Sequence, residues 1–291
     1  MANLELYKIF IIVAKEKNIT KASEILNISQ PAITKHIKNL ENELNTILFT
    51  RAKGMQLTKS GQQLYDKVLP AVNQIIEAEK ALTSNRNINF GTYATMLSRV
   101  LGDCVAEFYQ KNNKSKITAI TDPYNSLFEK LQNYELDILV VKKLEEKDYD
   151  SSKIKYIKLA DANFVLIANN KSNLSKKTIT IGDLKDKIIY IPRGETRSSL
   201  GFLELAKNNE LNTQIKKIDS VTMSNIIQKY DDCIGLANKF YMKDEIENNK
   251  VSILNIDFKI PSTEFGIYIH KNNTFPDLMD FVKILKNKFK V

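Results

Sequence analysis

Cysteines and long apolar runs are scarce in the 291-residue chain. The two cysteines, Cys104 and Cys233, are too few and too far apart for a disulfide framework or a cysteine-based metal site. Both stand in apolar segments, which predicts buried thiols. No run of about 18 apolar residues occurs, and no small-residue cleavage site follows the short apolar segment Ile9 to Ala14. The sequence therefore predicts a cytoplasmic protein without a membrane anchor.

Sequence signatures of catalysis are also missing. The two histidines, His36 and His270, stand far apart and in different predicted domains. No Walker loop, His-Glu-x-x-His, Gly-x-Gly-x-x-Gly or Gly-x-Ser-x-Gly motif occurs. The many Asp and Glu residues show no spacing that separates a catalytic pair from a salt-bridged surface. We therefore expect neither an enzyme nor a bound cofactor or metal.

Glycine and proline are few, and the net charge gives little information about the partners of the protein. Nine glycines and six prolines stand beside many Ile, Lys and Asn residues, a bias typical of an AT-rich coding sequence. Part of the net charge of +9 is therefore compositional. It divides into +4 for residues 1–60, −1 for residues 61–85 and +6 for residues 86–291. This charge is compatible with an anionic partner but does not by itself single out nucleic acid.

The apolar pattern divides the chain into three parts. Residues 1–58 are predicted to form short helices followed by a small hairpin around Lys53-Gly54. Residues 59–87 are predicted to form a long helix, capped by Thr58 and running to about Thr83, and then a polar hinge. Its apolar residues alternate at steps of four and three, which predicts pairing with a second helix: Leu64, Val68, Ala71, Ile75, Ala78 and Leu82.

Residues 88–291 alternate short apolar runs with helical patterns, which is typical of α/β units with mostly parallel sheets. We expect two lobes, the first from about 88–160 and 266–291 and the second from about 161–265. Nine segments are expected strands: 88–91, 116–120, 138–141, 163–168, 188–191, 215–218, 233–237, 253–256 and 265–269.

The segment from Thr20 to Leu44 has the parts of a helix-turn-helix. Thr20 and Ser29 are the expected caps of a short helix and a longer one, and the longer helix has one apolar and one polar face. Such a helix fits the major groove of DNA, where its first residues reach base edges. The candidate base-contacting residues are Gln30, Pro31, Thr34 and Lys35; the candidate phosphate contacts are Thr20, Lys38, Arg51 and Lys53. A solvated helix face is the alternative interpretation.

Three motifs resemble the N-terminal signature of LysR-type transcriptional regulators: the run from Thr20 to Glu41, Leu48-Phe49-Thr-Arg51, and Leu57-Thr58-Lys-Ser-Gly61. Farther along, Gly91 and Tyr134-Glu-Leu-Asp137-Ile-Leu-Val are similar to the effector domain of that family. The resemblance implies an α/β protein with an N-terminal all-α winged helix-turn-helix, a long linker helix and a two-lobed effector domain like a periplasmic binding protein. It also implies a homodimer through the linker helix, a homotetramer on promoter DNA, and RNA polymerase as a further partner.

The sequence departs from the family pattern in three places. Lys35 stands where many members have arginine, so a forked contact to guanine is less assured. The end of the predicted recognition helix is Asn42-Glu-Leu44-Asn45 instead of Glu-Glu-x-Leu-Gly, and Ala237-Asn238 replaces a common Leu-Pro.

A ligand of a two-lobed α/β domain binds between the lobes, where strand ends meet helix N-termini. Arg193 and Arg197 would favour a carboxylate or another anion, and we expect one of the two to bind it. Charges on a surface loop are the alternative. The candidate effector-binding residues are Thr92, Thr95, Tyr124, Asn125, Arg193, Thr196, Arg197, Ser198, Thr222 and Asn238.

The predicted function is therefore that of a DNA-binding transcriptional regulator controlled by a small, anionic molecule. A small-molecule carrier built on the bilobal domain is one alternative, but it leaves the first 85 residues unexplained. A DNA-binding protein that ignores ligands is the other.

Overall fold

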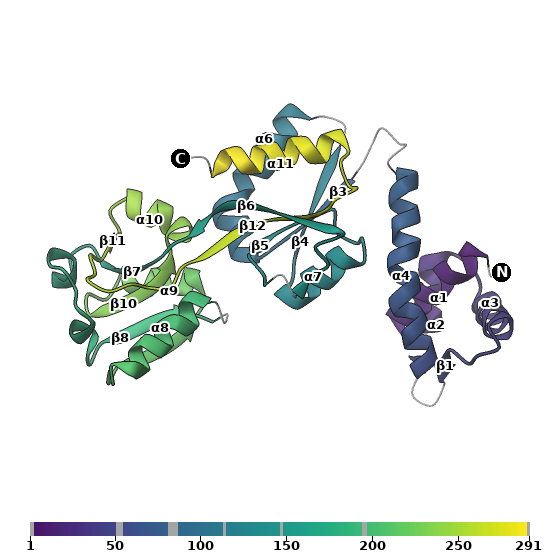
Figure 1. The fold of residues 1–291 in the computed structure, drawn as a ribbon, viewed down its shortest axis with the longest axis horizontal. Helices are drawn as coiled ribbons and strands as arrows, with labels where there is room; N and C mark the ends of the chain where they lie inside the picture. The colour runs from purple at the N-terminus through teal and green to yellow at the C-terminus, as the bar shows by residue number, and fades with distance from the viewer. Residues whose placement is uncertain are drawn as a thin grey trace. The chain divides into compact units, whose positions relative to one another are not determined.

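The computed structural model describes residues 3–50, 55–80, 87–112, 115–145, 148–193 and 197–289. Contacts divide the chain into two compact units: residues 1–86 with Phe128–Leu136, and Asn87–Leu127 with Asp137–Val291 (Figure 1). Among the helices in these described ranges, none has the length and apolar character that a membrane span requires.

The first part of the chain is helical and ends in a two-stranded hairpin and a long helix. Its elements are α1 (Leu4–Glu16), α2 (Ile19–Leu26), α3 (Gln30–Glu43), β1 (Phe49–Thr50), β2 (Gln56–Leu57) and α4 (Lys59–Lys80). The predicted cap of α3 is confirmed, because the Ser29 hydroxyl accepts a hydrogen bond from the amide of Ala32. The predicted cap of α2 is wrong. Asn18, not Thr20, caps that helix, because its side-chain oxygen accepts from the amides of Thr20 (2.8 Å) and Lys21 (3.2 Å).

One apolar core joins these helices to the hairpin. Phe10 is fully buried, and its ring lies edge-on to Phe49 at 5.4 Å and to Tyr65 at 6.4 Å. Ile33 and Ile37 of α3 are buried in the same cluster. The apolar face of α3 therefore holds the helix on the domain and leaves its polar face outside.

The long helix α4 divides its apolar residues between two surroundings. Its first turns pack on the core through the partly buried Leu64 and Val68 and the buried Leu69 and Val72. Farther along, the predicted seam residues Ala71 and Ile75 are exposed. Ala78 is exposed as well, and Leu82, the last position of the predicted seam, lies outside the described residues. The first residues of the predicted seam therefore pack in the core of their own domain, whereas Ala71 and Ile75 are exposed.

Gly61, in the first turn of α4, is required by a close backbone approach. A Cβ atom at this position would lie 2.1 Å from the carbonyl oxygen of Leu48, which precedes β1. The Thr58 hydroxyl accepts from the Gly61 amide (2.9 Å) and donates to the Ile47 carbonyl (2.8 Å), so the predicted cap at Thr58 is confirmed. The Thr58 and Gly61 positions together fix α4 against the hairpin.

The second part contains two five-stranded sheets, which define two lobes (Figure 1). The sheet of lobe I has the order β4 (Lys116–Thr121), β3 (Asn87–Thr92), β5 (Ile138–Lys142), β12 (Thr263–His270) and β6 (Ile154–Ala162). The sheet of lobe II has the order β11 (Val251–Ile253), β7 (Phe164–Asn169), β10 (Cys233–Asn238), β8 (Ile188–Pro192) and β9 (Gln214–Ile218). The chain crosses between the lobes through Asn163 and again between β11 and β12.

The expected predominance of parallel strands is wrong. In lobe I, β3 is parallel to β4 and β5, but β12 is antiparallel to β5 and β6. In lobe II, β8 is parallel to β9 and β10, but β7 is antiparallel to β10 and β11. All the antiparallel pairs of the two sheets involve the strands at the lobe crossings: β7, on which the chain enters lobe II, and β12, on which it returns to lobe I.

Helices cover both sheets. Lobe I carries α5 (Ala94–Met96), a π-helical segment η1 (Leu97–Leu101), α6 (Gly102–Lys111) and α11 (Pro276–Lys288). The helix α7 (Tyr124–Gln132) begins in this part of the chain, and its residues from Phe128 on are grouped with the first unit. Lobe II carries α8 (Arg197–Asn208), α9 (Ser220–Ile227), α10 (Lys243–Glu247) and the short 3-10 turns η3 (Asn173–Lys176), η4 (Ile181–Leu184) and η5 (Lys239–Met242). Cys104 belongs to the core of lobe I and Cys233 to that of lobe II, and both are buried free thiols, as predicted.

Candidate functional site

The polar face of α3 forms a shallow groove on the surface of the helical domain. Gln30 is the first residue of the helix, and Gln30, Pro31, Lys35 and Lys38 are exposed, whereas Thr34 is half-buried. Five of the predicted DNA-binding residues therefore lie together on one face. The groove is lined by Ile19, Gln30, Pro31, Thr34, Lys35, Lys38, Asn39 and Asn42.

The remaining predicted DNA contacts differ in position. Thr20 is exposed in the first turn of α2 but does not line this groove. Arg51 and Lys53 lie outside the described residues. Thr34 donates its hydroxyl proton to the Gln30 carbonyl (3.1 Å), so its side chain is available mainly as an acceptor.

Glu41 is a residue whose role the sequence pattern did not indicate. One of its carboxylate oxygens accepts hydrogen bonds from the amides of Leu48 (2.7 Å) and Phe49 (3.2 Å). This contact ties the last turn of α3 to the start of the hairpin. The two elements that would approach DNA are therefore held in one relative position by a charge-assisted contact.

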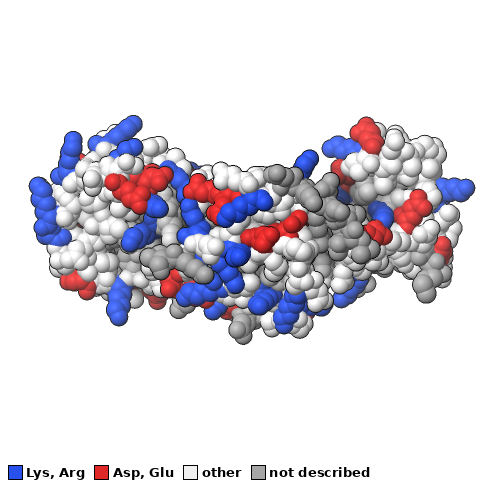
Figure 2. Space-filling view, turned by 90° about the horizontal axis from the view of Figure 1, so that it is seen from above, with Lys and Arg blue, Asp and Glu red and all other residues white. Residues whose placement is uncertain are grey.

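The charged side chains do not gather in one large basic patch on the face of the molecule seen in Figure 2. Lys and Arg side chains are scattered there and interleaved with Asp and Glu. This distribution agrees with the spread of net charge along the sequence. On this face, the charge distribution therefore does not mark a binding site for nucleic acid.

A second candidate site is a cavity of about 430 Å³ lined by residues of both lobes. Its walls are mainly aromatic and apolar: Tyr93, Met96, Pro123, Ala162, Phe164, Pro192, Ile218, Tyr241 and Phe265. Polar groups stand among them: Thr95, Tyr124, Lys142, Arg193, Asp219, Ser220, Asn238 and Thr263. An apolar hollow with a few polar groups is the usual form of a small-molecule site.

Four of the ten predicted effector-binding residues line this cavity: Thr95, Tyr124, Arg193 and Asn238. Thr92 does not, because its buried hydroxyl donates to the Val140 carbonyl at 2.7 Å within the sheet. Asn125 and Thr222 do not line the cavity either. Thr196 lies outside the described residues, as do the side chains of Arg197 and Ser198.

Arg193 and Asp219 bring opposite charges to the cavity from neighbouring strand ends. The Arg193 amide donates to the Ile218 carbonyl at 3.1 Å, which holds the residue beside the end of β9. The Arg193 side chain is exposed. Asp219 caps α9, because its carboxylate accepts from the amides of Val221 (3.1 Å) and Thr222 (2.9 Å) and from the Thr222 hydroxyl (2.7 Å).

The capping bonds have two consequences for the chemistry of the cavity. The hydrogen bonds from the backbone and hydroxyl of Thr222 lower the pKa of Asp219, so this carboxylate is ionised at neutral pH. The N-terminus of α9 is therefore already occupied by a negative charge. An anionic ligand would find its counter-charge at Arg193 or Lys142 instead of at this helix end.

The tyrosines of the cavity are neutral. Burial raises the pKa of Tyr241 to about 12, and burial also raises the pKa of Tyr93 and of Tyr124. The ammonium group of Lys142 lies 5.7 Å from the centre of the Tyr124 ring. The cavity thus combines aromatic walls and hydroxyl groups with two cationic side chains and one carboxylate.

Comparisons with known proteins agree with this architecture. Residues 4–62 match the family model for the bacterial regulatory helix-turn-helix protein of the lysR family, and residues 83–290 match the LysR substrate binding domain. The HTH-type transcriptional regulator YvbU of Bacillus subtilis, itself uncharacterized, is 28% identical over 196 residues, which make up 64% of this chain and 65% of YvbU. The aligned segment is therefore slightly less than two thirds of that relative.

Two solved structures share the fold. Full-length OxyR of Pseudomonas aeruginosa superposes with a TM-score of 0.72 at 16% identity, covering 100% of this chain and 95% of OxyR. CbnR, crystallised in complex with its target DNA, superposes with a TM-score of 0.62 at 17% identity, covering 98% of this chain and 99% of CbnR.

Proposed function

The chain belongs to the LysR family of bacterial transcriptional regulators, and from this we propose that it binds promoter DNA through α3 and responds to a small effector between its lobes. The observation that carries the proposal is the groove on α3, where Gln30, Lys35 and Lys38 stand exposed on a helix whose opposite face is buried. CbnR, which has the same fold, is known in complex with DNA. The same proposal assigns DNA binding to residues 1–58, the linker helix and hinge to residues 59–87, and effector binding to residues 88–291.

The groove residues have distinct roles in this proposal. Gln30, at the first helical position, makes a two-point contact with adenine, and Lys35 reaches guanine or a phosphate. Pro31 and Thr34 contact base edges beside them. Lys38, together with Thr20, Arg51 and Lys53, binds phosphates and sets affinity, not sequence preference.

Replacing Gln30 by alanine is expected to relax base preference at one position of each half-site. A good two-point contact contributes about 1–3 kcal/mol of discrimination, so preference there should fall roughly 5- to 150-fold. Selection of bound duplexes from a random library, followed by competition gel shifts, measures this change. Gln63→Ala, which truncates an exposed glutamine on α4, is the matched control. An unchanged sequence preference in the Gln30 variant would remove α3 from the role of reader.

We propose that the effector is a small carboxylate with an aromatic or otherwise apolar body. Arg193 can hold the carboxylate in a forked contact, and the rings of Tyr93, Phe164 and Phe265 can pack against the body. The volume of the cavity suits a ligand of modest size.

Arg193→Gln is expected to weaken carboxylate binding by about 1.5–3 kcal/mol, because the charge-assisted hydrogen bonds of the guanidinium are removed. The probe is benzoate, with benzamide as its uncharged counterpart, and the measurement is the shift in melting temperature of the full chain. Benzoate should stabilise the wild type more than benzamide does, and the difference should shrink in the variant, in which Lys142 is the remaining cation of the cavity. Equal responses to the two compounds would exclude Arg193 as the carboxylate site.

We also propose that two chains pair along α4. Ala71 and Ile75 are exposed apolar residues on this helix and continue the predicted seam beyond Leu64 and Val68, which pack on the chain's own core. Pairing would cover them and place two copies of α3 on one DNA duplex. Assembly into a homotetramer and contact with RNA polymerase belong to the same proposal.

A further inference from the structure

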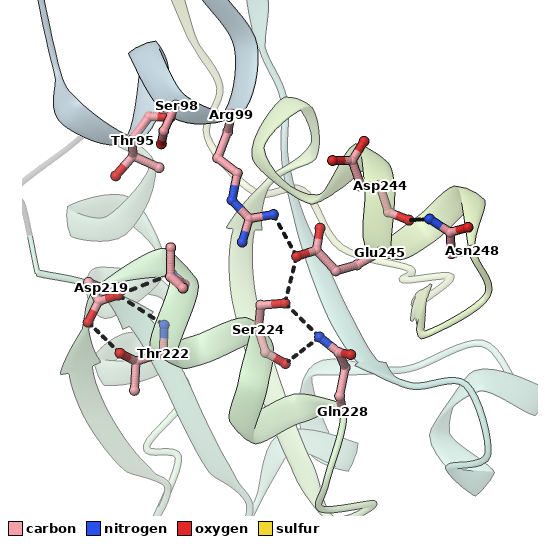
Figure 3. Close-up of polar contacts among 11 residues, drawn as sticks. Thr95, Ser98, Arg99, Asp219, Thr222, Ser224, Gln228, Asp244, Glu245 and Asn248 are labelled. Carbon is pink, nitrogen blue, oxygen red and sulfur yellow. Dashed lines mark hydrogen bonds and ion pairs between the residues drawn. The ribbon is translucent and has the colours of Figure 1, made fainter. Parts of the chain in front are cut away.

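An ion pair between a partly buried arginine and a buried glutamate joins the two lobes. The Arg99 guanidinium and the Glu245 carboxylate meet at 2.7 Å, and their side chains are 22% and 8% exposed. Arg99 belongs to the π-helical segment η1 of lobe I, and Glu245 belongs to α10 of lobe II. In Figure 3, Arg99 extends from its helix toward Glu245 on the other lobe.

Glu245 is also held from within its own lobe. The Ser224 hydroxyl of α9 donates to the same carboxylate oxygen at 3.0 Å, and the Gln228 side-chain amide donates to the Ser224 hydroxyl at 2.9 Å (Figure 3). The second carboxylate oxygen of Glu245 is buried without a hydrogen-bond partner. Burial raises the pKa of Glu245, but the contacts with Arg99 and Ser224 outweigh burial and leave the pKa below its usual value. The group is therefore a buried negative charge that depends on Arg99.

The pair connects the segments that form the cavity walls. Thr95 and Met96 line the cavity, and Arg99 follows them on the same helical stretch. On the other lobe, Tyr241 lines the cavity, and Glu245 follows it four residues later. A change in the distance between Arg99 and Glu245 therefore moves the two cavity walls relative to each other.

An apolar contact between the lobes lies close to the ion pair. The ring of Phe240, from η5 of lobe II, lies edge-on to Phe265 at 5.5 Å and to Phe289 at 5.5 Å, both in lobe I. Ring contacts of this kind tolerate small rotations, because apolar packing has little directionality. A buried ion pair does not, because its geometry must be good to offset desolvation. These two interlobe contacts therefore differ: the ring contact tolerates small rotations, and the ion pair demands a fixed geometry.

We propose that Arg99 and Glu245 form an interlobe latch, which selects one relative orientation of the lobes and thereby fixes the shape of the effector cavity. The π-helical turn at Leu97–Leu101 supports this role, because such turns are uncommon and often occur at functional positions. The latch concerns the relation between the lobes and does not depend on the DNA contacts proposed for α3. An effector that fits the selected orientation binds without first having to restrict the lobes, which raises its affinity.

The test measures two quantities in the full chain: the melting temperature and the distance between the lobes. The variants are Arg99→Met, Glu245→Leu and the double variant. The geometry is measured as the distance distribution between spin labels at Asp280→Cys in α11 and Lys207→Cys in α8, two exposed positions on different lobes. Dilution with unlabelled chain suppresses distances between subunits. Burial raises the pKa of Cys104 to about 11 and that of Cys233 as well, so labelling favours the introduced cysteines.

Each single variant is expected to lower the melting temperature, because one buried charge is left alone. The double variant should recover most of this loss, because an apolar pair can replace a buried ion pair. The distance distribution should nevertheless be about twofold broader than in the wild type in all three variants. Lys177→Gln, which removes an ion pair within lobe II, is the control and should leave the distribution unchanged. A double variant with the wild-type distribution would overturn the latch, as would equal broadening by Lys177→Gln.

Discussion

Replacing Lys38 by glutamate should reduce the affinity of the full chain for its operator on the order of 100-fold at moderate ionic strength. Lys38 is exposed on α3 and lines the groove beside Lys35, so its ammonium group would lie next to a phosphate. The substitution removes that attraction and introduces a repulsion in its place. In the dimer that we propose, the change occurs twice on each operator. Gel shifts or fluorescence anisotropy over a range of salt concentrations measure the effect.

The salt dependence separates a phosphate contact from a general charge effect. Lys38→Gln should make the slope of log K against log salt shallower by about 1 for each phosphate that the lysine no longer neutralises, at every sequence alike. Lys67→Glu, on the exposed surface of α4, makes the same change in net charge as Lys38→Glu but away from α3. If Lys67→Glu weakened binding as strongly as Lys38→Glu, affinity would follow net charge and the groove would have no special role.

Phe10→Ala should destabilise the helical domain by about 3–5 kcal/mol, because it leaves a cavity in a small core. The Phe10 ring is fully buried and contacts both Phe49 of the hairpin and Tyr65 of α4. Its removal therefore loosens the elements that hold α3 in place. We expect a separate, lower melting transition for the helical domain and an end to DNA binding at the temperature of that transition.

Calorimetry of the full chain measures both transitions. The transition of the two-lobed domain should stay within about 1–2 °C of the wild-type value, because that domain has its own cores. Ile25→Ala is the matched control, since Ile25 is 57% exposed on α2 and its truncation should cost little. A Phe10 variant that melted like the wild type would show that this core does not hold the reading helix.

The sequence pattern predicted α3 correctly, because this helix follows one physical rule, the burial of an apolar face. Ile33 and Ile37 recur at the helical period on a face that must be buried, which leaves Gln30 and Lys38 outside. The edge strand β6 was missed for the opposite reason. Its burial pattern is irregular and lysines such as Lys155 and Lys158 interrupt it, so it shows neither an apolar run nor a clean alternation. The expected strand at 253–256 was displaced to Val251–Ile253, since short apolar runs fix boundaries poorly.

The cavity was predictable only in part. Polar residues after strands indicated Arg193 and Asn238, because strand ends meet between the lobes. The same rule also selected Thr92, whose hydroxyl is committed to the sheet. Distance along the chain hid the pairing of Arg99 with Glu245, which are 146 residues apart. Only the folding of both lobes brings such groups together, so no local pattern marks them.

The most direct test of the account is a competition measurement with the wild-type chain. A labelled duplex from the intergenic region upstream of its own gene is challenged with the same unlabelled duplex and with a scrambled duplex of equal length and composition. We predict that the specific duplex competes at least about 1,000-fold better at physiological salt, and that Gln30→Ala reduces this advantage by roughly 5- to 150-fold for each half-site. Equal competition by the two duplexes, with and without small-molecule extract, would contradict the assignment of α3 as a reader of DNA sequence.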